Sequence, residues 1–100
     1  MITEALVVRM EAKPGKEEAV AAFLKEALAA VEAEQETAAW FAVRMGPSTF
    51  GVFDAFPDER GRRAHLVAGL GAALQLKAPE LLERPPLIEE GAVLAAKLPH

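Results

Sequence analysis

The sequence contains no cysteine, no asparagine and no tyrosine, and its single serine is Ser48. Without cysteine, the chain can form neither a disulfide framework nor a thiolate nucleophile. Ser48 ends the short turn segment Gly46-Pro47-Ser48, so no serine nucleophile with a neighbouring base can be argued. The two histidines, His65 and His100, are too few for a three-ligand metal site, and we expect neither a metal nor another cofactor.

Long apolar runs and an excess of positive charge are also missing. No stretch has the length of a membrane-spanning helix, and the N-terminus lacks the basic start and apolar run of a secretion signal. The net charge of -4 argues against non-specific binding to nucleic acid or to an anionic membrane. Hydrophobic residues make up 52% of the chain, which indicates one folded domain over residues 1–100, and we expect it to be cytoplasmic.

Apolar periodicity and turn residues predict six elements in the order strand, helix, strand, strand, helix, strand. The second helix begins after an N-cap at Asp58, bends or breaks near Gly69 and Gly71, and is followed by a separate short turn after Pro79. A buried stripe is expected on the first helix, formed by Val20, Leu24, Ala27, Leu28 and Val31. The predicted ranges are 5–13, 16–33, 38–45, 49–56, 58–76 and 87–98.

This order of elements predicts an α+β protein with a ferredoxin-like split β-α-β fold (βαββαβ). Two right-handed crossovers joined by a central hairpin give a four-stranded antiparallel sheet with two helices on one face. The hairpin register stays open, because a two-residue loop places Trp40 opposite Phe53 and a three-residue loop places it opposite Asp54. The hairpin strands are apolar on both faces, so the face without helices is expected to pair with a second copy in a homodimer.

Three stretches are V-R-M-E-A-K-P-G-K-E-E at 8–18, F-G-V-F-D-A-F-P-D-E at 50–59 and A-H-L at 64–66. Together they resemble the antibiotic biosynthesis monooxygenase superfamily of dimeric α+β barrel proteins. The resemblance implies a small apolar pocket between sheet and helices in each protomer. It also implies a cofactor-independent monooxygenase that oxidises a small aromatic or quinol substrate with dioxygen.

The sequence departs from that family at several positions. It has no asparagine, it has Phe56 where the family often has tryptophan, and Leu70 stands where haem-degrading relatives carry their iron-binding histidine. These departures favour an alternative, a non-catalytic homodimeric protein that binds a small apolar or aromatic ligand. A regulatory ligand-binding module is a third reading, because the same fold serves that role too.

His65 and Asp54 are the candidate catalytic residues. His65 can act as a general base that takes a phenolic or quinolic proton, or it can be a structural histidine bonded to a carboxylate or carbonyl. Asp54 lies between apolar neighbours in a strand, where it can serve as the acid or base, orient His65, or form a salt bridge with Arg44 or Arg9.

The candidate substrate-binding residues are three aromatic side chains and one cation. An aromatic ligand can stack on them, whereas aromatic residues at strand spacing are more often core or interface, and Arg44 can polarise a substrate carbonyl or simply reach solvent. A small basic cluster on the second helix (Arg60, Arg62, Arg63) is expected on a solvated face. The substrate-binding set is Phe56, Trp40, Phe53 and Arg44.

Overall fold

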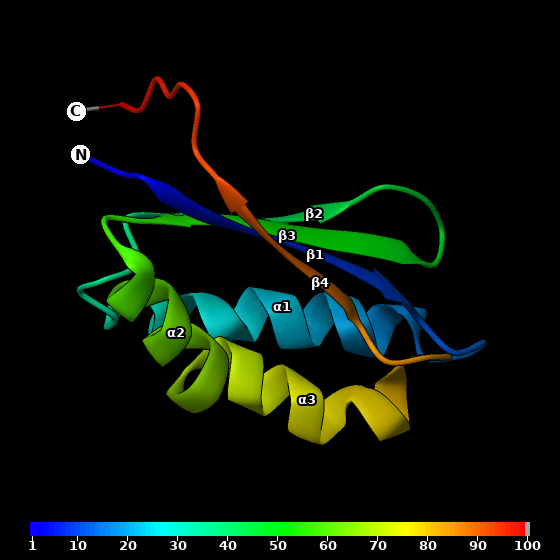
Figure 1. Cartoon of the computed structure of the whole chain (residues 1–100). Coiled ribbons are helices and arrows are strands. Elements are labelled where there is room, and N and C mark those ends of the chain that lie inside the picture. Colours follow the sequence, from blue (N-terminus) through cyan, green and yellow to red (C-terminus); the bar gives the residue numbers. More distant parts are fainter. Residues whose placement is uncertain (100) are drawn as a thin grey trace.

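A computed structural model describes residues 1–99, and within them it confirms the predicted order of elements (Figure 1). One predicted helix is divided in two, so the described residues form four strands and three helices. They are β1 (Glu4–Glu11), α1 (Glu17–Glu32), β2 (Ala39–Arg44), β3 (Thr49–Phe56), α2 (Glu59–Ala68), α3 (Leu70–Leu81) and β4 (Leu87–Ala92).

The four strands form one antiparallel sheet in the order β2-β3-β1-β4. All three helices cover the same face of this sheet, and the opposite face carries none of them (Figure 1). This is the ferredoxin-like α+β arrangement that the sequence predicts. Trp40 pairs with Asp54 across β2 and β3, so the second of the two hairpin registers is the one adopted.

The core lies between the sheet and the helices α1 and α3. Alternation along β1 turns Leu6, Val8 and Met10 toward the helices, and each is less than 10% exposed. The predicted stripe on α1 is correct except at Leu28, which is 47% exposed. Leu28 lies beside the cavity between α1 and β2, so no core residue covers it.

The second predicted helix differs in detail from the structure. The Asp58 side chain caps α2 by accepting a hydrogen bond of 3.0 Å from the Gly61 amide, as the sequence predicts. The expected break occurs at Gly69, but the separate turn after Pro79 is wrong, because α3 continues through this proline to Leu81. A proline inside a helix removes one backbone donor, and the loss here falls in the last turn, where Leu82 still donates to the Ala78 carbonyl at 2.8 Å.

The last strand is shorter than predicted, ending at Ala92 rather than near residue 98. Ala92 pairs with Glu4, the first residue of β1, and only one further backbone bond follows, from Val93 to Thr3 at 2.9 Å. The strand therefore ends where its partner ends.

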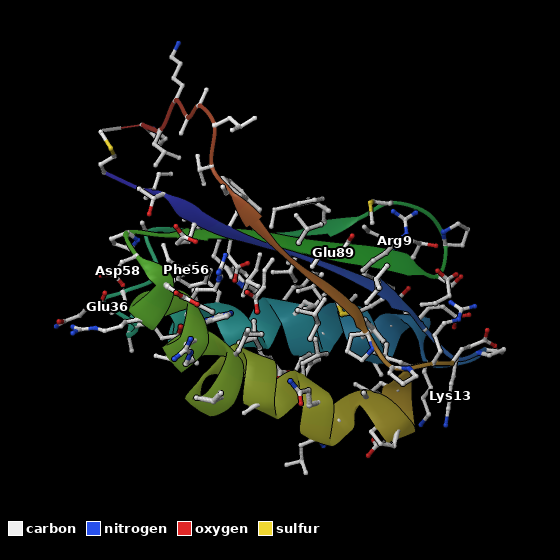
Figure 2. The ribbon with its side chains drawn as sticks, viewed as in Figure 1. Arg9, Lys13, Glu36, Phe56, Asp58 and Glu89 are labelled. Atoms are coloured by element: carbon white, nitrogen blue, oxygen red, sulfur yellow. The ribbon has the colours of Figure 1, made fainter. Side chains whose placement is uncertain are left out.

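The sheet face away from the helices is partly apolar. Phe41, Phe53 and Val7 lie side by side across three strands, and each is between 39% and 55% exposed. Glu89 continues this row on β4, and Figure 2 shows it on the opposite side of the sheet from Phe56. We call this surface the open face.

Candidate functional site

A buried histidine joins three parts of the fold. His65 Nε2 on α2 lies 2.9 Å from Asp54 Oδ2 on β3, and His65 Nδ1 lies 2.6 Å from Glu34 Oε1 in the segment after α1. His65 is 5% exposed and Asp54 is 4% exposed. Among the partners that the sequence left open for Asp54, the structure shows His65, and Glu34 completes a carboxylate–imidazole–carboxylate chain.

Two glycines let the segment after α1 approach α2. Gly61 and Gly69 stand four residues before and four residues after His65, so all three share one helix face. A Cβ at Gly69 would meet the Glu34 carboxylate oxygen at 2.7 Å, and one at Gly61 would meet Glu36 at 3.0 Å. Larger residues at either position would push the acidic segment away from His65.

The sequence interpretation did not identify Glu34 as a partner of His65. In the structure, Thr37 donates a hydrogen bond of 2.8 Å to the same Glu34 oxygen that contacts His65. The spacing Gly61-x3-His65-x3-Gly69 was the available signal, because it marks a helix face kept clear for a close neighbour. No residue pattern around Glu34 in the sequence indicated that Glu34 would be this neighbour.

The two carboxylates control the charge of His65. Burial acts to lower the pKa of His65, but the contacts with Asp54 and Glu34 outweigh burial and raise this pKa above its usual value. A protonated imidazole with both nitrogens engaged has no free lone pair. This geometry supports the structural role that the sequence left open for His65 more directly than the general-base role.

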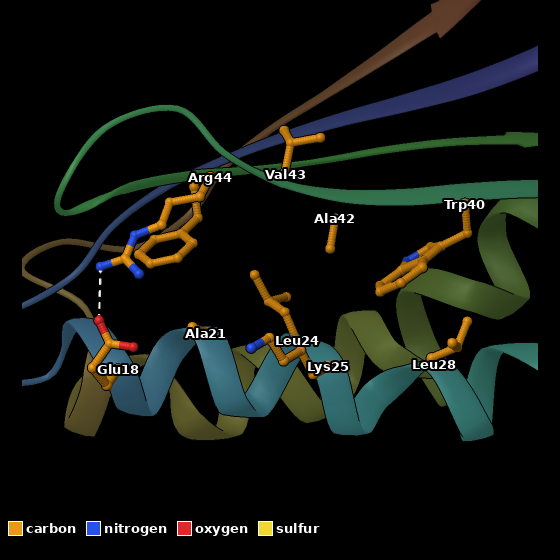
Figure 3. Close-up of a pocket in the computed structure, with 10 residues that line it drawn as sticks. Glu18, Ala21, Leu24, Lys25, Leu28, Trp40, Ala42, Val43 and Arg44 are labelled. Atoms are coloured by element: carbon orange, nitrogen blue, oxygen red, sulfur yellow. Dashed lines mark ion pairs between the residues drawn. The ribbon is translucent and has the colours of Figure 1, made fainter.

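An apolar cavity of about 440 Å³ lies between β2 and α1 (Figure 3). Trp40, Ala42 and Arg44 follow one another along its β2 side, and Figure 3 shows the Trp40 indole projecting toward α1 near Leu28. Cavities of this size accommodate small organic ligands. Leu24, Phe50 and Ala21 are among the other residues that line it.

Arg44 occupies one end of this cavity. Its Nη2 lies 3.0 Å from Glu18 Oε2 and donates a hydrogen bond of 2.8 Å to the Pro47 carbonyl, while the guanidinium lies 5.1 Å from the Phe50 ring centre. The side chain is 40% exposed. Arg44 is thus held in place yet still accessible, and it forms no salt bridge with Asp54.

Trp40 occupies the other end of the cavity, beside Asp54. The Trp40 Nε1 donor is buried without an acceptor, and neither Asp54 oxygen receives an aligned hydrogen bond, although His65 pairs with Oδ2 at ion-pair distance. Buried polar groups in folded proteins are usually satisfied. These unpartnered atoms on adjacent strands therefore require an explanation.

The structure divides the predicted site residues into separate places. Trp40 and Arg44 line the cavity between β2 and α1, whereas His65 borders a second, smaller cavity of about 260 Å³ beside Glu34 and Thr37. Phe56 is 0% exposed and packs on the imidazole of His65, with ring centres 5.4 Å apart. Phe53 lies on the open face, on the opposite side of the sheet from the cavity that Trp40 lines.

Within residues 1–99, no group of three or more histidine, aspartate or glutamate side chains is arranged to hold a metal ion. Over the same residues, none of the helices combines the length and the apolar character that crossing a membrane requires.

The fold is shared with several proteins of known structure. The chain has the fold of the antibiotic biosynthesis monooxygenase superfamily, with the cavity between sheet and helices that the resemblance implies. A proposed antibiotic biosynthesis monooxygenase from Nitrosomonas europaea matches it with a TM-score of 0.80 at 14% identity, covering 92% of this chain and 90% of that one. Rv0793 from Mycobacterium tuberculosis matches with a TM-score of 0.82 at 18% identity, covering 94% and 97%.

The particular family is shown by a more similar protein. NE2512, a protein of unknown function from Nitrosomonas europaea, is 58% identical over 100% of this chain and 97% of its own, with a TM-score of 0.96. The chain belongs to the same family as NE2512. No family model matches the sequence, and no curated protein matches it either.

Proposed function

We propose that the protein binds a small aromatic or quinol molecule between β2 and α1 and oxidises it with dioxygen, without a metal or flavin. The cavity of about 440 Å³ carries this proposal, because it combines the flat faces of Trp40 and Phe50 with the Arg44 cation. Aromatic walls suit a flat ring. The Arg44 guanidinium is suited to donate hydrogen bonds to a carbonyl or phenolate oxygen on the bound aromatic ring.

The reaction balances without an added reductant. A phenol loses its hydroxyl proton, and the electron-rich anion transfers electrons to dioxygen and forms a new carbon–oxygen bond at a ring carbon. The other oxygen atom leaves as water, taking two hydrogens from the substrate, and the product is a quinone. The protein needs to accept a proton and to stabilise an oxyanion.

Asp54 is the proposed acid–base residue, and His65 is proposed to position it. Asp54 is the cross-strand partner of Trp40, which lines one end of the cavity, but Asp54 itself is 4% exposed and is not one of the lining residues. His65, held by Glu34, fixes the orientation of this carboxylate. Arg44 at the other end is positioned to stabilise negative charge on the substrate.

Oxygen uptake with a panel of naphthols and quinols tests this function. Ala21→Phe fills the cavity from α1, whereas Ala22→Phe alters an exposed neighbour that does not line the cavity. We expect Ala21→Phe to abolish substrate-dependent oxygen uptake, because it fills the cavity. Ala22→Phe should consume oxygen at the wild-type rate, because its cavity is intact. Asp54→Asn should be slower than wild type, because it lacks the proton acceptor. Equal uptake by all of these proteins would contradict the proposed site.

The second candidate is ligand binding without turnover, and the geometry of His65 favours it. Both ring nitrogens contact carboxylates, so the only buried histidine in residues 1–99 has no free position for a substrate proton. Tryptophan fluorescence reports on binding directly, because Trp40 is the only tryptophan and lines the cavity. Saturable quenching by naphthols, with no oxygen consumed, selects this candidate over the enzyme.

We also propose that the protein is a homodimer joined through the open face. The row of Phe41, Phe53 and Val7 presents large apolar side chains to water, and burial of each contributes roughly 1.5–3 kcal/mol. Face-to-face packing of two such sheets would cover this row on both copies. It would leave the cavity between β2 and α1 on the helix side of each protomer.

Sedimentation at micromolar concentration tests the dimer. Phe41→Glu places a charge on the open face, and Leu76→Glu places one on α3, where Leu76 is 82% exposed on the helix side. We expect a dimer that Phe41→Glu dissociates and Leu76→Glu does not. A monomeric wild type, or the reverse pattern in the variants, would exclude this interface.

A further inference from the structure

Two rows of side chains face each other across the cavity between β2 and α1. The α1 row recurs every three or four residues and the β2 row at every second residue, as expected where each element turns one face to a neighbour. The rows are Glu18, Ala21, Lys25 and Leu28 on α1, and Trp40, Ala42 and Arg44 on β2. Figure 3 shows Ala21 and Ala42 between the end that holds Arg44 and the end that holds Trp40. These two small side chains leave the middle of the cavity open.

The walls of the cavity carry more positive than negative charge. They hold the cations Lys25 and Arg44 and one carboxylate, Glu18, although the chain as a whole has a net charge of -4. None of the ion pairs within residues 1–99 involves Lys25. Lys25 lies one helical turn after Ala21, which separates it from Glu18. A cation without a protein carboxylate beside an apolar cavity attracts a negative charge on a ligand.

Arg44 supplies the second cation in a fixed orientation. Its polar contacts with Glu18 and with the Pro47 carbonyl both use Nη2. A guanidinium also has N–H donors on Nη1 and Nε, and no hydrogen bond among the described residues uses them. The Phe50 ring lies 5.1 Å from the guanidinium, and this packing holds the group beside the cavity. Arg44 is therefore positioned to accept a further anion without rearrangement.

We propose that the ligand of this cavity is an aromatic carboxylate, with its ring in the open middle and its carboxylate between Lys25 and Arg44. A planar guanidinium matches the two oxygens of a carboxylate. One such group also neutralises the positive charge that Glu18 leaves unbalanced. The inference rests on the proposed function, since it names the class of aromatic substrate that the same cavity admits. A hydroxyl on the ring would then be the group that is oxidised.

Glu18 distinguishes this site from a general attraction of acids. Its Oε2 lies 3.0 Å from Arg44 Nη2, and its side chain is 83% exposed. Exposed ion pairs contribute little to stability, so a ligand carboxylate can replace Glu18 beside Arg44. Glu18→Gln removes this competing charge. The variant should therefore bind an aromatic carboxylate more tightly and a neutral aromatic molecule as wild type does.

Calorimetry with 2-naphthoate and 2-naphthamide tests the carboxylate site. The two molecules have nearly the same shape, and at neutral pH only 2-naphthoate is an anion. We expect wild type to bind 2-naphthoate about tenfold more tightly, as hydrogen bonds to a charged group would give. In about 1 M sodium chloride this preference should shrink, because salt screens exposed charges.

Matched variants assign the preference to the cavity. Lys25→Gln should lower the affinity for 2-naphthoate about two- to fivefold, the range of one exposed ion pair, and Glu18→Gln should raise it by a similar factor. Neither should change the affinity for 2-naphthamide. Lys77→Gln on α3 and Glu26→Gln on α1 are the controls, because they remove the same charges at exposed positions that do not line the cavity.

The outcomes separate this site from the proposed function. Equal affinities for 2-naphthoate and 2-naphthamide would overturn the carboxylate site and leave the aromatic cavity in place. Equal effects of Lys25→Gln and Lys77→Gln would do the same. Binding of neither ligand would also overturn the carboxylate site, and the absence of naphthol-dependent oxygen uptake in addition would overturn the proposed function.

Discussion

Glu34 Oε1 lies 2.6 Å from His65 Nδ1, and this contact fastens the segment between α1 and β2 to helix α2. Because Asp54 holds the other ring nitrogen, the imidazole connects that segment to the sheet as well. A charged histidine is the form that both carboxylates stabilise. The stability of this junction should therefore depend on pH.

The free energy of unfolding should fall as the pH rises above neutrality. The pKa of His65 is raised in the folded protein, so the folded state binds the proton more tightly than the unfolded state does. The stabilisation is fully present below the unfolded pKa of about 6.5 and is lost as the pH passes through the raised pKa of the folded state. Denaturant unfolding of wild type and His65→Gln between pH 5 and 9 measures this difference, which should be absent in the variant.

Glu34→Gln should lower the pKa of His65 toward its usual value. The amide oxygen can still accept from Nδ1, but the negative charge that favours the protonated ring is lost. A titration of the His65 ring protons by nuclear magnetic resonance checks this, with Glu36→Gln as the neighbouring control. An unchanged His65 pKa in Glu34→Gln would show that Asp54 alone sets it.

Arg62→Met should destabilise the fold far more than Arg63→Ala. Arg62 is 8% exposed, forms ion pairs of 3.1 Å with Glu4 and Glu90, and donates to the Gly91 carbonyl at 3.0 Å, so it joins α2 to β1 and β4. Both glutamates are partly exposed, and we expect a loss of about 2 kcal/mol rather than the 3–5 kcal/mol of a fully buried pair.

Arg63 supplies the control for this comparison. It pairs with Glu59 one helical turn away, and both side chains are more than half exposed. Such pairs contribute about 0.3–0.5 kcal/mol. Equal losses in urea unfolding of the two variants would contradict the bridging role of Arg62.

Gly71→Ala should destabilise the junction of α2 and α3 by about 1–3 kcal/mol, the usual cost of overpacking. A Cβ at Gly71 would lie 2.7 Å from Leu66 Cα and 2.9 Å from the Leu66 carbonyl oxygen, both backbone atoms that cannot rotate away. Gly46→Ala is the control, because its Cβ would meet nothing nearer than 3.9 Å. Thermal unfolding should separate the two variants by several degrees.

The four-stranded antiparallel sheet followed from the order of the elements. The strands and the first helix were predictable because alternating and helical apolar spacing records which side of each element is buried. Leu6, Val8 and Met10 are an example, since their positions alone define the core face of β1. Contact between Asp54 and His65 was a correct hypothesis for a similar reason. A carboxylate among apolar strand residues needs a buried partner, and the fold leaves few candidates.

Other features depend on geometry that local sequence does not contain. Arg62 belongs to a basic cluster that was expected in solvent, and only the approach of the β4 end to α2 makes it a buried bridge. Phe53 and Trp40 were both predicted to contact substrate, yet the register places them on opposite sides of the sheet. A one-residue change in pairing reverses such assignments, and loop length alone did not determine it.

Strand β2 carries Trp40 and Arg44, the two ends of the cavity wall, and it lies at the margin of the sheet with hydrogen bonds to β3 alone. Outward movement of this strand would break a single ladder and leave the pairing of β1 with β3 and β4 undisturbed. Besides this ladder, the β2 wall of the cavity is held by the packing of Trp40 on the core and by the ion pair between Arg44 and Glu18. Substitutions at the β2 positions that line the cavity would therefore alter its shape without changing the pairing of β1 with β3 and β4.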